Sequence, residues 1–369
     1  MTYNEYYDYY EIDKTEALWR IIYGERSNGK TYGFKKKAID NYVNNKKQFA
    51  YVRRRKEEAK SSSMSELFKD MTEYINESFK SLFPDFDSFS IIGKVGKFTL
   101  YGYKENEMVE LDTIGFYFIL STARYNKSIP YPNVTLFCYD EFLTDGLEIT
   151  NEFSVLLNLI STIKRKRTDL TIYLLGNTVN RNSSILKELN INIRDIPQGA
   201  IKCYEYGDGE LRNTVAVEYC RHYEQVKESE QYFVFNTPRE MMIRNGEWET
   251  SNYECFSEAE FYNNQFSNCI IFDGGQYRLY GYISNNGYLW VTDKRMKNLE
   301  SMKFLTFTTG ETYPNRMTFN WNCPEVRIVN IRSKLNALIY NRKVKYKNNL
   351  IGDDFESFRM YAENKKTSL

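Results

Sequence analysis

The segment 24–31 has the residue types and the spacing of a phosphate-binding loop. It reads GERSNGKT and matches the Walker A pattern G-x-x-x-x-G-K-[ST] at every position. In such a loop the glycines let backbone N–H groups surround phosphate oxygens, the lysine contacts the β- and γ-phosphates, and the last hydroxyl binds Mg²⁺. We therefore expect ATP and Mg²⁺ as ligands. The residues expected to bind the nucleotide are Gly24, Arg26, Ser27, Asn28, Gly29, Lys30 and Thr31, and Thr31 is also expected to bind the metal.

Two adjacent acids, Asp140 and Glu141, end a strand-like segment farther along the chain. The residues before them, 134–139, read VTLFCY, which is typical of a buried strand. In a Walker B strand the first acid helps to bind Mg²⁺ and the second polarises the water that attacks the γ-phosphate. We assign these two roles to Asp140 and Glu141. An apolar strand that merely ends in two acids is the simpler alternative, and the phosphate-binding loop upstream argues against it.

The segments around these residues must position them, and their patterns predict an α/β fold. An apolar, strand-like run at 18–23 leads into the loop, and apolar residues recur at helical spacing from 32 to 43. Further strand-like segments occupy 49–52 and 171–177, and a helical apolar stripe at 153–163 precedes the latter. This order predicts a P-loop NTPase of the class with a catalytic glutamate (ASCE), in which a mostly parallel sheet is flanked by helices.

Three further polar residues are candidates for completing the site. Arg165 lies in a KRKR run at the end of the helical stripe, where a cation suits the helix dipole. It is also a candidate arginine finger for the γ-phosphate of a neighbouring subunit. Asn177 ends a strand-like segment, either as a turn residue or as a sensor of the γ-phosphate. Arg26 is a candidate for holding Glu141 away from water, because a buried acid needs a partner.

The composition excludes several classes of function. No apolar run reaches the roughly 18 residues of a membrane span, so we expect no membrane partner. The six cysteines are far apart and His222 is the only histidine, which excludes zinc sites of the ordinary type. Nucleophilic catalysis by histidine would depend on that one residue. Cysteines without such spacing indicate reduced thiols in a cytoplasm.

The chain has 369 residues, enough for two domains, and its charge changes sign along the sequence. The net charge is +1, but residues 224–260 contain nine acids against three Lys/Arg, whereas 294–347 contain 12 Lys/Arg against three acids. Such a change indicates a domain boundary and a basic C-terminal surface, which either is simply solvated or binds a partner. We expect an ATPase domain at 1–220, a helical linker at 221–260 and a small α+β domain at 261–369.

The order of these motifs resembles that of the DNA-packaging ATPases of phi29-like bacteriophages. The resemblance spans about residues 15–180, and its carrying stretches are GERSNGKTY, QFAYVRR, YPNVTLFCYDEF, NEFSVLLNL and LLGN. It implies a homopentameric ring that drives double-stranded DNA through the phage portal into the prohead, inside the host cytoplasm. Whether a scaffold RNA takes part stays open.

The resemblance also implies roles for particular residues. Arg165 matches the arginine finger that the family provides in trans, and Lys127 matches a second basic residue offered across the subunit interface. Asn177 matches a position that couples hydrolysis to movement. Lys56 falls in a DNA-contacting loop, and Arg54 beside it is also expected to bind DNA.

For the C-terminal domain the resemblance implies an RNase H-like fold that has lost its catalytic acids. Asp273, Asp293, Asp353 and Asp354 are then expected to be turn residues, and the basic surface is expected to grip DNA or to dock on the prohead. A surviving two-metal nuclease is the alternative for these acids. For the whole chain the alternatives are a DNA helicase or conjugative translocase, and a nucleotide-gated capsid assembly factor.

Overall fold

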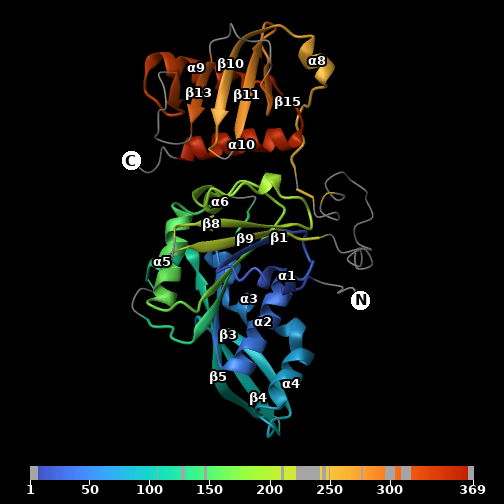
Figure 1. Ribbon diagram of the computed structural model, residues 1–369, viewed down its shortest axis with the longest axis vertical. Helices are drawn as coiled ribbons and strands as arrows, with labels where there is room; N and C mark the ends of the chain where they lie inside the picture. Colours follow the sequence, from blue (N-terminus) through green and yellow to red (C-terminus); the bar gives the residue numbers. More distant parts are fainter. Residues whose placement is uncertain are drawn as a thin grey trace. The chain divides into compact units, whose positions relative to one another are not determined.

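The computed structural model of the chain (Figure 1) describes residues 7–105, 107–125, 129–144, 148–208, 212–221, 242, 247–248, 250–275, 277–295, 304–308 and 317–364. The chain forms two compact units, Met1–Glu249 and Thr250–Leu369. Residues 250–260, which we had expected in a linker, belong to the second unit. Most of the rest of that linker, with His222, lies outside the described residues.

The first unit is built on one large sheet, in which the described residues form nine strands. In sequence order they are β1 (Trp19–Gly24), β2 (Gln48–Arg53), β3 (Ser88–Lys94), β4 (Lys97–Lys104), β5 (Glu107–Ile119), β6 (Val134–Asp140), β7 (Thr171–Asn177), β8 (Ile201–Tyr206) and β9 (Asn213–Tyr219). The order across the sheet is β3-β4-β5-β2-β6-β7-β1-β9-β8. All neighbours from β5 to β9 are parallel, and β3, β4 and β8 are antiparallel additions at the edges. The predicted mostly parallel sheet is confirmed.

Helices connect these strands and cover both faces of the sheet. The α-helices are α1 (Tyr10–Asp13), α2 (Lys30–Asn45), α3 (Ser61–Glu66), α4 (Thr72–Lys80), α5 (Glu152–Lys164) and α6 (Ser184–Glu188). Short 3-10 helices are η1 (Lys56–Ala59), η2 (Lys69–Met71), η3 (Leu120–Tyr125) and η4 (Ile193–Asp195). Parallel neighbours require such crossover connections, so their helices bury both faces.

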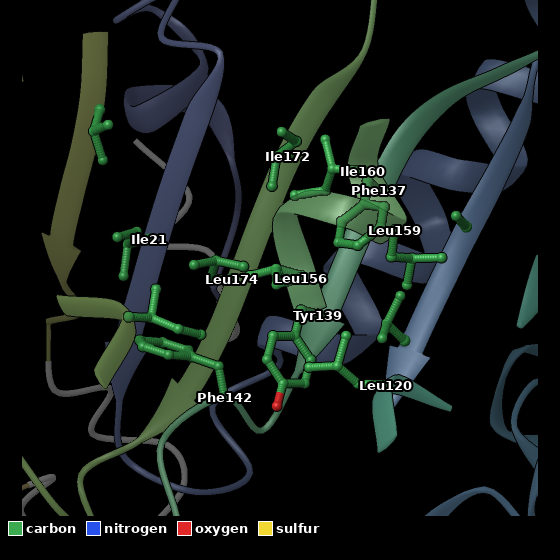
Figure 2. Packing of buried hydrophobic residues seen from close by; sticks show 14 of the residues in the cluster. Ile21, Leu120, Phe137, Tyr139, Phe142, Leu156, Leu159, Ile160, Ile172 and Leu174 are labelled. Carbon is green, nitrogen blue, oxygen red and sulfur yellow. The ribbon is translucent and has the colours of Figure 1, made fainter. Parts of the chain in front are cut away.

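The two faces of the sheet carry separate apolar clusters, one under α5 and one under α2. Phe137 and Tyr139 of β6 belong to the α5 cluster (Figure 2), whereas Leu136 and Cys138 belong to the α2 cluster. This alternation follows from the two-residue period of a strand. Polar residues at the strand ends continue the same alternation, so neighbouring polar residues there also point to opposite faces of the sheet.

The second unit has its own sheet, in the order β14-β13-β10-β11-β12-β15. The strands are β10 (Phe266–Asp273), β11 (Arg278–Ser284), β12 (Leu289–Thr292), β13 (Phe304–Thr308), β14 (Thr318–Asn320) and β15 (Val344–Tyr346), and the helices are α8 (Glu258–Tyr262), α9 (Val326–Tyr340) and α10 (Asn349–Asn364). β10, β11 and β12 form an antiparallel meander, and β13 and β14 are parallel to β10. This is the strand order of the expected RNase H-like fold, with β15 added at one edge.

At least three of the four acids considered for a nuclease have a partner nearby, and the expectation of turn residues is wrong for Asp353 and Asp354, which lie within α10. Asp273 at the end of β10 pairs with Arg278 at 2.7 Å, and Asp293 after β12 pairs with Lys347 at 2.7 Å. Asp353 accepts a hydrogen bond from the Tyr253 hydroxyl at 2.9 Å. Over the described parts of both units, no three His, Cys, Asp or Glu side chains gather closely enough to hold a metal ion. Within the same residues, no helix has the length and apolar character to cross a membrane.

Candidate active site

The phosphate-binding loop lies between the end of β1 and the start of α2, as its sequence predicts. Gly29, just before α2, has φ +92°, a left-handed conformation that favours glycine. Gly24 is required for a different reason, because a Cβ there would lie 2.7 Å from the Cβ of buried Cys220. One glycine therefore shapes the loop, and the other lets β1 approach the end of β9.

Lys30, the first residue of α2, is held inside the loop. Its side chain is buried, and Nζ donates to the Glu25 carbonyl at 2.6 Å and to Asn28 Oδ1 at 3.0 Å. Burial lowers the pKa of the Lys30 ammonium. Within the described residues, its hydrogen bonds go to neutral acceptors, and Asp140, Glu25 and Glu141 act on its charge through electrostatic attraction, so this ammonium can accept a phosphate as a further partner.

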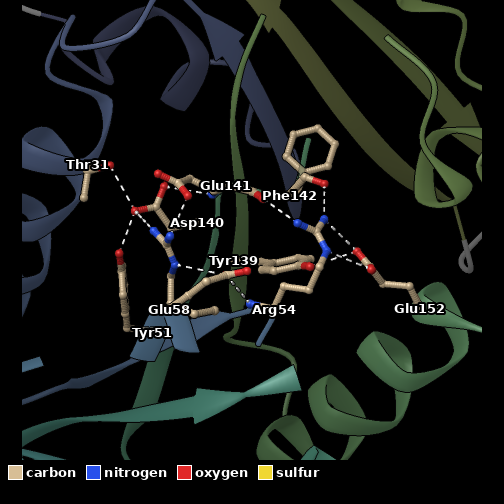
Figure 3. A network of polar contacts seen from close by, with 10 residues as sticks. Thr31, Tyr51, Arg54, Glu58, Tyr139, Asp140, Glu141, Phe142 and Glu152 are labelled. Atoms are coloured by element: carbon tan, nitrogen blue, oxygen red, sulfur yellow. Dashed lines mark hydrogen bonds and ion pairs between the residues drawn. The ribbon is translucent and has the colours of Figure 1, made fainter. Parts of the chain in front are cut away.

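Asp140 at the tip of β6 faces the start of α2 (Figure 3). Its Oδ2 accepts hydrogen bonds from the Thr31 hydroxyl at 3.0 Å and from the Tyr51 hydroxyl at 2.6 Å. A hydroxyl and a carboxylate are oxygen ligands of the kind that Mg²⁺ uses, and Mg²⁺ in such sites takes its other ligands from water and substrate phosphates. Thr31 and Asp140 therefore fit the metal site expected from the sequence. Tyr51 was not expected there.

Glu141 follows directly and turns its side chain toward β2. Its backbone has φ +57°, and its peptide N–H donates to Asp140 Oδ1 at 3.0 Å. The carboxylate is half exposed and receives Arg53 Nη2 at 2.5 Å. Arg53 also approaches Asp140 Oδ2 at 3.7 Å. This ion pair with Arg53 gives Glu141 a partner that the sequence does not predict, beside the one that we predict at Arg26.

One cavity of about 660 Å³ brings these groups together. Among the described residues, its lining comprises loop and helix residues 26–32, Asp70, Asp140, Glu141 and residues 175–177 at the tip of β7. Asn177 is included, and it lies next to Gly24 in the β1–β7 register. Gly24 does not line the cavity, but its carbonyl lies 3.5 Å from Lys30 Nζ. A larger cavity of about 760 Å³ runs along the outer side of α2 and contains none of the predicted site residues.

Two predicted residues, Arg165 and Lys56, do not line this cavity. Arg165 follows the last residue of α5 with φ +51°, and it does not line the cavity. Lys56 begins η1, is exposed, and lines a separate cavity of about 440 Å³ with Lys60. Lys127 lies outside the described residues.

Arg54, which we predict to contact DNA, lies in the interior of the first unit. Its side chain is 3% exposed, and Nε meets Glu152 Oε2 at 2.9 Å while Nη1 donates to the Glu141 carbonyl at 3.0 Å. The reason is the alternation of β2, which sends Arg53 to the α2 face and Arg54 to the α5 face. Arg54 therefore supports the interior behind the acids (Figure 3).

Glu218 on β9 is a partly buried carboxyl whose raised pKa makes the stability of the first unit depend on pH. Burial raises the pKa of its carboxyl to about 7, although the Tyr7 hydroxyl (2.7 Å) and Arg221 oppose this and Asp8 and Glu11 add to it. The folded chain then keeps a proton that the unfolded chain has lost, so this group costs stability progressively from about pH 5 to 7. We expect Glu218→Gln to be about 1–3 kcal/mol more stable than the wild type at pH 8. At pH 5 the two should match.

Urea unfolding at both pH values measures this difference. If the difference in free energy of unfolding between the variant and the wild type were the same at pH 5 and pH 8, the pKa of Glu218 would not be raised in the folded chain.

Comparisons with known proteins show which proteins the chain is similar to. The podovirus DNA encapsidation protein (Gp16) family matches residues 1–196, which is more than half of the chain. The DNA packaging protein of Bacillus phage phi29 is 30% identical over 167 residues, and that of Bacillus phage B103 is 31% identical over 168 residues. These matches cover 44% of this chain and 44–45% of the relatives, so the chain aligns with less than half of their length.

A solved structure of the bacteriophage Phi-29 viral genome packaging motor assembly is similar over 97% of this chain and 100% of the matched chain, with a TM-score of 0.56 and 20% identity. At that identity the similarity establishes the fold alone. The extent of the family match carries the assignment: the chain belongs to the podovirus DNA encapsidation protein (Gp16) family.

Proposed function

We propose that this protein is an ATPase that drives double-stranded DNA into a phage prohead. The observation that carries the proposal is the cavity in which Lys30 and Thr31 of the loop face Asp140 and Glu141 at the tip of β6. Family membership and the relatives named as DNA packaging proteins support the biological role. The place of action would be the host cytoplasm, with the prohead and its portal as partners, and a scaffold RNA is compatible with it.

Each polar group of the cavity has a part in hydrolysis. Lys30 stabilises negative charge on the β- and γ-phosphates, and the loop N–H groups orient them. Thr31 and Asp140 would hold Mg²⁺, which supplies charge neutralisation at the phosphate oxygens. Glu141 polarises the attacking water, but only after its carboxylate leaves Arg53, because a carboxylate that is bound to a guanidinium is a weaker base.

A neighbouring subunit would complete the site. Hydrolysis spreads negative charge over the γ-phosphoryl oxygens, and Arg165 lies away from the cavity of its own chain. We propose that Arg165 and Lys127 act on the adjacent subunit of a homomeric ring, a pentamer, with an acceleration of about 10³- to 10⁵-fold. ATP hydrolysis in one subunit then depends on the position of its neighbour, so hydrolysis can pass from one subunit of the ring to the next. Asn177 would couple the state of the γ-phosphate to movement of the DNA.

DNA would be held through its phosphates. Lys56 is exposed at the start of η1, next to Lys60, and both can reach a backbone without reading bases. A packaging motor must accept every sequence, so contacts of this kind suit it, and its affinity should fall steeply with salt. Translocation along intact duplex, measured by displacement of a third strand, would distinguish this motor from a helicase, which separates the two strands.

Mixing two inactive variants tests the shared site. Glu141→Gln subunits keep the finger and Arg165→Ala subunits keep the acid, so mixed rings should regain ATPase activity at those interfaces where both are intact. The matched control mixes Glu141→Gln with Lys30→Ala, because then every subunit lacks a residue of its own cavity and no interface can recover. Failure to recover in the first mixture at any ratio would contradict the trans assignment of Arg165.

A further inference from the structure

The N-terminal segment Tyr7–Tyr9, which we call the N-terminal arm, lies against the phosphate-binding loop from outside the cavity. The Tyr7 N–H donates to the Asn28 carbonyl at 2.8 Å, and the Tyr9 hydroxyl donates to the Lys30 carbonyl at 2.7 Å. None of the arm lines the nucleotide cavity. The arm therefore bonds two carbonyls of the loop without contacting the site of hydrolysis.

The arm is packed in place as tightly as a core element. Tyr7 and Tyr9 are 4% and 6% exposed, and their rings meet edge to face with centroids 5.0 Å apart. Tyr9 also packs on Tyr173 of β7 at 5.3 Å. Gly33 of α2 makes room for the arm, because a Cβ there would lie 2.8 Å from the Tyr9 ring. The hydroxyl of Tyr9 is thus held at the Lys30 carbonyl by packing on three sides.

Peptide planarity connects these two bonds to phosphate binding. A carbonyl and the N–H of the next residue lie in one plane and point in opposite directions. A donor on the Asn28 carbonyl therefore restrains the direction of the Gly29 N–H, and a donor on the Lys30 carbonyl adds to the restraint that α2 places on the Thr31 N–H. The loop also contains a left-handed conformation at Ser27 (φ +60°), which a residue other than glycine keeps only where the surroundings enforce it.

We propose that the N-terminal arm preorganises the loop for phosphate, and that the Tyr9 hydroxyl is a positioning residue for nucleotide binding. The inference rests on the proposed function only in that the loop must bind nucleotide. Without the bond to the Lys30 carbonyl, the loop samples more peptide orientations and the affinity for nucleotide falls. The chemical step should change little, because the hydrogen bonds described for Tyr7 and Tyr9 reach backbone carbonyls of the loop and not the side chains of Lys30 or Glu141.

The test measures ADP binding by calorimetry and ATPase rates on the full-length chain. Tyr9→Phe removes the hydroxyl and keeps the ring, so the dissociation constant for ADP and the KM for ATP should rise by about 2- to 10-fold, the equivalent of one hydrogen bond. The kcat should stay within twofold. Tyr10→Phe is the matched control, since Tyr10 is the next residue, is 65% exposed and has no contact with the loop carbonyls described above.

Two further variants separate the possible failures. Gly33→Ala removes a helix-interior glycine, a change that by itself favours the helix, but it displaces the Tyr9 ring and should weaken ADP binding as Tyr9→Phe does. If Tyr9→Phe binds ADP like the wild type while Lys30→Ala does not bind it, the inference about the arm is overturned and the nucleotide site stands. If the wild type does not bind ADP, both proposals fail.

Discussion

Replacing Glu141 with glutamine is expected to lower ATP hydrolysis by about 10²- to 10⁴-fold, the usual contribution of a general base, while ADP binding stays intact. Glutamine keeps the shape of the side chain and can still accept a hydrogen bond from Arg53, but it cannot take a proton from water. The phosphates are bound by the loop around Lys30, which this change does not touch. Single-turnover hydrolysis and calorimetric ADP binding separate the two effects.

Glu58→Gln is the matched control for that experiment. Glu58 also approaches Arg53, at 3.5 Å from its Nε, but it does not line the cavity. We expect its hydrolysis rate to stay within threefold of the wild type. If Glu141→Gln hydrolysed ATP at a near-normal rate, or if Glu58→Gln were equally inactive, the acid that polarises water would have to be sought elsewhere.

Replacing Arg54 with alanine is expected to destabilise the first unit by about 3–5 kcal/mol, the typical cost of removing one partner of a buried ion pair. Glu152 is 0% exposed, and its carboxylate also accepts from the Tyr139 hydroxyl at 2.8 Å and the Ile149 N–H at 3.0 Å. Without Arg54 these two donors would be left to stabilise a buried charge alone. Urea unfolding of the full-length chain, followed by tryptophan fluorescence, measures the loss.

Two comparisons identify the cause of that loss. Arg53→Ala should cost less, because its partner Glu141 is half exposed and can be solvated. The double change Arg54→Met with Glu152→Leu should recover most of the stability, because it removes both charges and keeps the volume. If Arg54→Ala unfolded like the wild type but bound DNA more weakly, the sequence-based assignment of Arg54 to DNA would be right after all.

The local parts of the candidate site could be predicted from the sequence. The loop 24–31 and the start of α2 depend on glycine conformations and helical periodicity, which neighbouring residues determine. The tip of β6 could be predicted because a buried parallel strand reads as a continuous apolar run, and its two acids stand where that run stops. The fold class then predicts that the loop after β1 and the tip of β6 lie close together, since the C-terminal ends of parallel strands share one edge of a sheet.

The two arginines at the end of β2 show what the local pattern leaves undecided. The pattern YVRR gives both of them the same charge and the same neighbourhood, and we predict a DNA contact for Arg54 and no role for Arg53. Strand alternation sends them to opposite faces, Arg53 toward Glu141 and Arg54 toward Glu152. That signal was present in the sequence, but it becomes decisive only when the pairing of β2 with β6 fixes which face is which.

The sequence by itself determined the chemistry of this protein: a lysine and a hydroxyl on a glycine loop, two acids on a strand tip, and the fold class that brings them to one edge. Only the tertiary structure decided which partners hold those groups. Three contacts of this kind join residues that are 21 to 89 positions apart in the sequence: Arg53 with Glu141, Tyr51 with Asp140, and Tyr9 with the Lys30 carbonyl. Local periodicity carries no information on such pairs, because they form only when strand order and helix packing bring distant segments together.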